Sequence, residues 1–350
     1  MKTTVEAIQD LITAVGGTEP PKVGKTVEAL KQLYVAMGGE AADVADVGTI
    51  PDAVEMLAAQ NIEVNYKTML AGVIGRTAVN LIVPDGVESI PSIDGQYGTK
   101  VGMFKGVTAL KTVKLPETLT EIGIDTFDGC TNLEKINIPA ALTILGNSAF
   151  YNCTNLEGDF IIPESVTALG NAFYGCAKIN SVTVAGQITT LGAGAFYECK
   201  GLKTVNLPNS VSEIGSNAFS KCESLESFDF PTALTKLGDS VFSSCKKIEN
   251  LTIPGTLTTI GYTVFAGCSG LKNVDIEEGV TSLPMGMFNN CTSLEKIYLP
   301  STVTDISNEC FQGCNQDTLT IYCAFSENAV SGAPWGVTNA TIVYDYTPSE

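Results

Sequence analysis

The chain has no histidine, few basic residues and no long apolar run, and each shortage excludes a kind of function. Lys and Arg number 20 against 38 Asp and Glu, which gives a formal net charge of −18 at pH 7. Such a surface repels phosphate backbones and anionic headgroups, so we expect neither nucleic acid nor membrane partners. Without histidine as a ligand or general base, we predict no metal site, no cofactor and no enzymatic activity.

The lack of a long apolar run also bears on location. No stretch approaches the roughly 18 apolar residues of a membrane span, and the N-terminus lacks the continuous apolar segment of a secretory signal. We therefore expect synthesis and assembly in the cytoplasm, without membrane insertion. A processed chain that has lost its signal and stands on a bacterial cell surface is the alternative.

What the chain does have is a repeat, because phenylalanine recurs every 23 residues and nine cysteines follow at a fixed offset of three. A constant period of this size indicates one supersecondary unit that stacks on copies of itself. The sequence predicts a solenoid of about ten rungs with one phenylalanine at the axis of each. The phenylalanines are Phe104, Phe127, Phe150, Phe173, Phe196, Phe219, Phe242, Phe265, Phe288 and Phe311.

Residues 199–219 show the roles expected within one unit. Val205 and Leu207 alternate with polar residues and predict a strand with one buried face, which Pro208 ends. A second short apolar pair ends at Ile214, and the glycine after it is predicted to take a left-handed turn. The glycines at that place are Gly123, Gly146, Gly170, Gly192, Gly215, Gly238 and Gly261.

Nine of the eleven cysteines occupy one repeat position, from Cys130 to Cys314. Stacked rungs give them parallel side-chain directions, whereas a disulfide needs Cβ atoms aimed at one another. We predict free, buried thiols that fill space and donate weak S–H hydrogen bonds to a turn backbone.

The units at residues 148–156 and 202–208 resemble BspA-like leucine-rich repeats, and the resemblance covers about three quarters of the chain. Members of that family resemble surface-displayed binding or adhesion proteins of microbes, and similar repeats occur in bacteriophage particles and prophages. The resemblance implies recognition rather than catalysis, and a leucine-rich repeat fold.

The ends of the chain follow other patterns. Residues 1–66 predict a helical module with helices at 4–17, 26–39 and 51–59, which either covers the first rung or anchors the protein to other virion or surface proteins. Residues 67–322 form the predicted solenoid, and residues 323–350 a β cap whose residues 341–344 add an edge strand. The predicted class is therefore an α/β solenoid with a projecting loop at residues 92–102.

One candidate ligand site is the polar row between the buried strand positions. A glycan or a peptide of extended shape could run along this row, although a solvated strand face would contain the same residues. Asn206, Asp229, Asp275 and Tyr298 are its leading candidates. The full row is Asn137, Thr183, Asn206, Asp229, Thr252, Asp275, Tyr298 and Thr320.

A second candidate site is an aromatic column. Tyr151, Tyr174 and Tyr197 each follow the axial phenylalanine in three consecutive rungs. Rings at rung spacing could stack on sugar faces, or pack over the turn of the neighbouring rung.

The sequence thus favours a non-catalytic binding or structural protein. We expect a tail or head-associated component of a bacteriophage or prophage virion, in which a rigid leucine-rich repeat surface recognises a receptor on the host. A bacterial adhesin for host protein or glycan is the alternative, and a glycosidase built on two carboxylates is a remote one. Oligomers are compatible with either location.

Overall fold

The computed structural model describes residues 79–83, 86–90, 92–94, 100–315 and 317–347. The predicted helices at residues 4–17, 26–39 and 51–59 lie outside these ranges. Within them the chain forms strands, turns and bends but no helix, so no helix there could cross a membrane. The described part is a β-solenoid, and the α component of the predicted class falls entirely on residues outside it.

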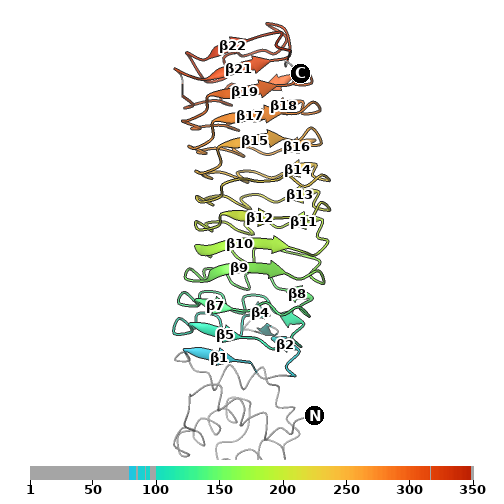
Figure 1. Ribbon diagram of the computed structural model, residues 1–350, viewed down its shortest axis with the longest axis vertical. Helices are drawn as coiled ribbons and strands as arrows, with labels where there is room; N and C mark the ends of the chain where they lie inside the picture. The colour runs from blue at the N-terminus through green and yellow to red at the C-terminus, as the bar shows by residue number, and fades with distance from the viewer. Residues whose placement is uncertain (1–78, 84–85, 91, 95–99, 316, 348–350) are drawn as a thin grey trace, which may run out of the picture.

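The strands stack in one long column, rung upon rung (Figure 1). One side carries a parallel array in three hydrogen-bonded groups, and the outward side of this array is called the strand face below. Its strands are β1 (Asn80–Ile82), β5 (Thr112–Lys114), β7 (Lys135–Ile136), β9 (Glu157–Ile162), β10 (Lys178–Val184), β12 (Thr204–Asn206), β15 (Asn250–Ile253), β17 (Asn273–Ile276), β19 (Lys296–Leu299), β21 (Thr320–Cys323) and β22 (Thr341–Val343).

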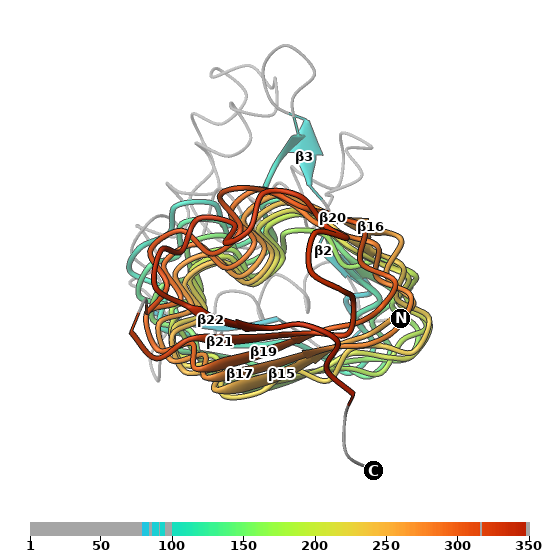
Figure 2. The ribbon, with the colours of Figure 1, turned by 90° about the horizontal axis from the view of Figure 1, so that it is seen from above.

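A second set of short parallel strands forms another side of the column. Seen from above, the rungs superimpose as a ring, with β15, β17, β19, β21 and β22 along one edge (Figure 2). The strands of the second set are β2 (Ser89–Ile90), β6 (Glu121–Ile122), β8 (Ile144–Leu145), β11 (Thr190–Leu191), β13 (Glu213–Ile214), β14 (Lys236–Leu237), β16 (Thr259–Ile260), β18 (Ser282–Leu283) and β20 (Asp305–Ile306).

One pair of strands departs from this pattern, since β3 (Ile93–Asp94) and β4 (Lys100–Val101) run antiparallel. Strand β3 stands outside the ring of stacked rungs in Figure 2. This position agrees with the predicted projection of the segment from residue 92 to residue 102.

The predicted phenylalanine axis is confirmed. All ten rings are at most 1% exposed. Neighbouring rings stack with centroids 5.3 Å apart for Phe104 and Phe127 and at most 5.8 Å apart, for Phe173 and Phe196. A ring of this kind contributes about 2–3 kcal/mol by burial before chain entropy is subtracted, so the row makes one continuous narrow core.

The role predicted for the cysteines is confirmed as well. Each of the nine repeat thiols donates to the backbone oxygen of the axial phenylalanine one rung earlier, as Cys199 Sγ does to Phe173 O at 3.1 Å. Burial raises the pKa of Cys130 and of Cys268 to about 12, so these thiols keep the proton that they donate. The cysteine row therefore ties each rung to the one before it.

The glycines after the second strand do not have the predicted left-handed conformation. They are needed because successive rungs approach too closely for a Cβ atom. A Cβ built on Gly215 would lie 2.6 Å from the backbone nitrogen of Ala193, and one on Gly146 would lie 2.4 Å from the backbone of Gly123. The left-handed residues instead flank the phenylalanine, as Asn217 (φ 60°) and Lys221 (φ 62°) flank Phe219.

At the C-terminal end, the predicted edge strand is confirmed over Thr341–Val343, since β22 pairs in parallel with β21 as the last strand of its sheet. Trp335 is fully buried, and its backbone oxygen accepts a hydrogen bond of 3.0 Å from Phe311 N. These contacts extend the core beyond the last phenylalanine; the domain boundaries at residues 66 and 322 stay predictions.

Candidate binding face

The strand face holds most of the candidate residues, and the strand register fixes their order. Thr252 lies opposite Asp275, which lies opposite Tyr298. Tyr298 in turn lies opposite Tyr322, because Thr320 pairs with Lys296. The prediction of Thr320 as the next member of the polar row was therefore wrong, since the last rung is one residue longer.

The side chains of two members of the predicted polar row form hydrogen bonds with neighbouring rungs of the protein. The side-chain amide of Asn137 takes the place of a backbone partner for Leu115. Its Nδ2 donates to Leu115 O at 2.9 Å, and its Oδ1 accepts from Leu115 N at 2.7 Å. Asn206 Nδ2 donates to Thr183 Oγ1 at 3.2 Å. Asn206 lies outside the hollow described next.

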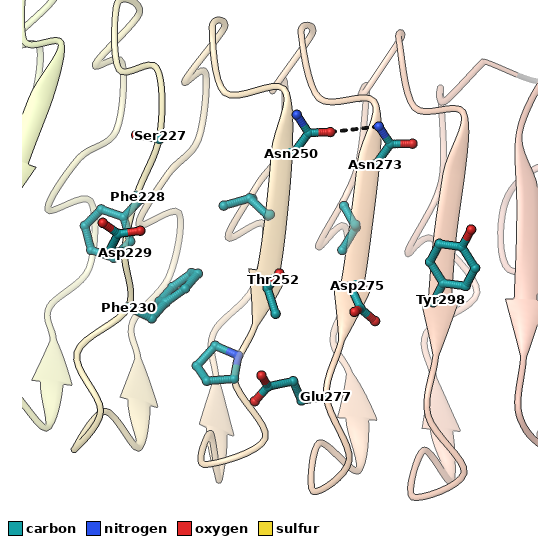
Figure 3. A pocket seen from close by; sticks show the side chains of 13 residues that line it. Ser227, Phe228, Asp229, Phe230, Asn250, Thr252, Asn273, Asp275, Glu277 and Tyr298 are labelled. Carbon is teal, nitrogen blue, oxygen red and sulfur yellow. Dashed lines mark hydrogen bonds between the residues drawn. The ribbon is translucent and has the colours of Figure 1, made fainter. Parts of the chain in front are cut away.

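A groove of about 550 Å³ crosses four rungs of the strand face. It brings together three of the predicted residues, Asp229, Asp275 and Tyr298. Together with Thr252, which lies between the two aspartates, they stand in four successive rungs (Figure 3). The other lining residues are Ser227, Phe228, Phe230, Asn250, Leu251, Pro254, Asn273, Val274 and Glu277.

The groove exists because one rung of the sheet is not a strand. Residues 227–230 stand between β12 and β15, where no strand forms. No backbone hydrogen bond joins their peptide groups to other described residues. The peptide groups of this rung are left for water or for a ligand.

Two phenylalanines pack on the inner side of this rung. Phe228 and Phe230 occupy inward positions that hold Leu251 and Ile253 one rung later. The Phe228 ring packs 4.7 Å from Phe242, and the Phe230 ring packs 5.9 Å from the same ring. One phenyl ring in this column is compatible with a strand, since Phe160 stands in the same column within the paired strand β9. The rung at residues 227–230 differs in placing two phenyl rings against one axial ring.

The charge of the groove has one sign. Asp229, Asp275 and Glu277 line it, and no Lys or Arg is among the lining residues. Glu277 Oε2 accepts a hydrogen bond of 3.1 Å from Gly255 N, while no described residue forms an ion pair with Asp229 or Asp275. Asn273 Nδ2 donates to Asn250 Oδ1 at 2.7 Å, which makes one border neutral and polar (Figure 3).

Tyr298 is the first ring of an aromatic cluster that the sequence did not indicate. Tyr322 stacks on it at 4.8 Å, and Tyr346 lies 4.8 Å from Tyr322. The signal that could have found Tyr322 is the apolar pair Ile321 and Cys323, which matches Ile297 and Leu299 after a shift of 24 residues instead of 23.

The predicted tyrosine column lies elsewhere, on the turns that carry the phenylalanines. Tyr174 stacks between Tyr151 at 4.4 Å and Tyr197 at 4.5 Å, and the ammonium of Lys221 lies 4.8 Å from the Tyr197 ring centroid. Burial and the neighbouring Tyr151 raise the pKa of Tyr174 to about 12. Since both faces of Tyr174 are covered, a sugar would meet mainly ring edges here; sugar binding by this column stays a prediction.

No group of three or more Cys, Asp or Glu side chains in the described ranges is placed to hold a metal ion. The cysteines that a metal would need are each buried. What the strand face offers chemically is therefore hydrogen bonds, aromatic surface and negative charge.

These features define a parallel β-solenoid of leucine-rich repeat type. The BspA type leucine rich repeat region matches residues 80–203 and 189–318 in six copies. The chain belongs to the BspA-type leucine-rich repeat family. No curated protein matches it.

Several solved structures are similar to the chain. A leucine-rich repeat protein from Bacteroides ovatus is 22% identical over 76% of this chain and 94% of its own, with a TM-score of 0.39. The pneumococcal vaccine antigen PcpA is 17% identical over 77% and 79% of the two chains, with a TM-score of 0.47. A leucine rich cell surface protein from Faecalibacterium prausnitzii is 23% identical over 72% and 93%, with a TM-score of 0.31.

Proposed function

We propose that this protein is a non-catalytic recognition protein that presents its strand face to a partner on a cell surface. The observation that carries the proposal is the groove of about 550 Å³ at Asp229, Asp275 and Tyr298 on the strand face. Phenylalanine, cysteine and glycine rows hold every rung in place, so the face needs little ordering when it binds.

We further propose that copies of the protein are displayed on a bacteriophage or prophage particle, through the segment of residues 1–66. This placement rests on the resemblance of the repeats to repeats that occur in bacteriophage particles and prophages. Repeated copies would raise a modest affinity per groove to a useful avidity. A bacterial cell-surface adhesin is the second candidate, supported by family membership alone.

The binding role is tested with the labelled full chain on a panel of intact bacteria. Thr252→Lys places a long cation in the groove and should abolish binding to the cells that the native chain binds. Thr259→Lys is the matched control, because Thr259 is also exposed but belongs to β16 in the second set of strands. Equal loss in both variants, or no bound cell in the panel, would contradict the proposal.

The location is tested with an antibody against the native chain. Detection in purified particles from induced cultures is the expected result for a virion component. Labelling of intact uninduced bacteria, with none in particles, would establish the adhesin instead.

A further inference from the structure

The two tyrosine clusters in the described part of the chain end differently, although both lie on repeated rungs. The column of Tyr151, Tyr174 and Tyr197 ends under a cation, since Lys221 Nζ lies 4.8 Å from the Tyr197 ring centroid. Glu198 holds that ammonium through an ion pair of 2.7 Å. Tyrosine, lysine and carboxylate thus form one unit within the fold.

The cluster at the groove has the tyrosine and the carboxylate but lacks the cation. Tyr322 stacks on Tyr298 at 4.8 Å and Tyr346 lies 5.5 Å from it, while Asp275 is the neighbour of Tyr298 in the preceding rung. No described cation lies over Tyr298, and Asp275 has no ion pair with any described residue. Lys296 on the same strand stands in the row of Asn273, outside the groove lining.

The rest of the groove suits an extended chain. Phe230 and Pro254 supply apolar surface, Asp229 and Glu277 extend the negative charge, and the peptide groups of residues 227–230 are unpaired within the described structure. Main-chain hydrogen bonds with alternate side chains in pockets are how extended peptides bind beside strands. A neutral sugar would use the ring of Tyr298 but would leave three carboxylates without a countercharge.

We propose that the groove binds an extended basic segment of a partner protein, with a Lys or Arg side chain that contacts both the Asp275 carboxylate and the ring of Tyr298. This inference rests on the proposed recognition function and names the chemistry of its partner. The internal unit of Tyr197, Lys221 and Glu198 shows the arrangement that the bound cation would reproduce. Charge complementarity also makes the complex sensitive to salt.

The test uses the full chain and two short N-acetylated peptides, one of alternating Arg and Thr and one with Gln in place of each Arg. Binding is measured by fluorescence anisotropy at low and at physiological salt. We expect the Arg peptide to bind and the Gln peptide to bind at least about tenfold more weakly, because only the former supplies a cation.

Variants of the groove decide whether binding is local. Asp275→Asn and Tyr298→Leu should each weaken Arg-peptide binding about three- to tenfold, whereas Tyr298→Phe keeps the ring and should stay within about twofold. Glu157→Gln is the matched control, since it removes one exposed charge from β9, outside the groove. Urea unfolding curves that superimpose on the native curve establish that each variant is folded.

Equal affinities of the Asp275→Asn and Glu157→Gln variants would overturn the proposal, because attraction by net charge alone predicts that result. Equal binding of the Gln peptide would overturn it in favour of a neutral ligand. If the Thr252→Lys variant no longer binds bacteria but the native chain does not bind the Arg peptide, the recognition function stands and this inference fails. Local peptide binding without any cell binding would support the site and reject the cell-surface function.

Discussion

The strand face of this solenoid and its turn side, which is the side formed by the turns that carry the phenylalanine and cysteine rows, are built from the same repeats. The residue at a given position changes little between rungs on the turn side and much more on the strand face. The turn side keeps phenylalanine in ten rungs and cysteine in nine. The strand face changes residue at each step, from Thr252 through Asp275 and Tyr298 to Tyr322. A side chain on the turn side contacts the same atoms of the next rung every time, whereas one on the strand face has water as an alternative partner. Residues on the strand face can therefore change from rung to rung without disturbing the core.

Alkaline pH should have the largest effect on the turn side. Burial raises the pKa of the row thiols from Cys130 to Cys291 above that of thiols in an unfolded chain, and for Cys130 and Cys268 the pKa is about 12. The unfolded chain therefore loses protons first as pH rises, so the contribution of the thiols to stability is complete only below about pH 8. Above the unfolded pKa of about 8.5 it falls by up to about 1.4 kcal/mol per thiol per pH unit.

Urea unfolding midpoints at about pH 8 and about pH 10.5 measure this effect. The Cys222→Ala variant should show a shallower fall, because one titrating thiol is absent. An identical midpoint at both pH values would contradict the role of the cysteine row.

Removal of one axial ring should have the next largest effect. Phe265 stacks between Phe242 at 5.4 Å and Phe288 at 5.6 Å, so Phe265→Ala leaves a gap in the core and should cost about 3–5 kcal/mol. Tyr262→Ala in the same turn is the control, because Tyr262 is 56% exposed. Chemical denaturation of both variants gives the difference, and equal losses would show that the axis is not the main source of stability.

A methyl group on the glycine row should have a smaller effect. The Cβ of a Gly215→Ala variant would meet the backbone of Ala193 at 2.6 Å, so two rungs must separate, at a cost of about 1–3 kcal/mol. Ser224→Ala, at a half-buried position of the next rung, should change stability little. The midpoint temperatures of thermal unfolding compare the two variants. An unchanged midpoint in Gly215→Ala would mean that neighbouring rungs can move apart without loss of stability.

The smallest predicted effect lies on the strand face itself. Amides of residues 227–230 have no hydrogen bond to other described residues, whereas Asn273–Ile276 belong to the paired strand β17. Hydrogen exchange should be at least about tenfold faster in the first segment, a difference of about 1.4 kcal/mol. Comparable protection would mean that the sheet continues through this rung.

The sequence predicted the rows because each depends on contacts that repeat with the period. Phe104 to Phe311 could be assigned to the axis from spacing alone, and so could the thiol donors from Cys130 to Cys314. The glycine row was placed correctly but explained wrongly, because the close approach at Gly215 involves Ala193, which a single unit does not reveal.

The candidate site was only partly predictable. Asp229, Asp275 and Tyr298 were chosen as members of a polar row, and the structure places all three in one groove. The groove itself was missed, although Phe228 and Phe230 stand at inward positions that hold aliphatic residues in neighbouring rungs. Tyr322 and Tyr346 were missed because the last rungs no longer keep the 23-residue period.

The sequence by itself determined the solenoid, its rung length, its axis and its acidic surface, since each follows from a local pattern repeated along the chain. The tertiary structure alone decided at which rung the strand pairing is interrupted, which acidic residues share a groove, and that the tyrosine cluster at Tyr298 has no described cation over it. These depend on how the side chains of one rung fit against those of the next. Such fit is a property of neighbouring rungs in space, and no single repeat encodes it.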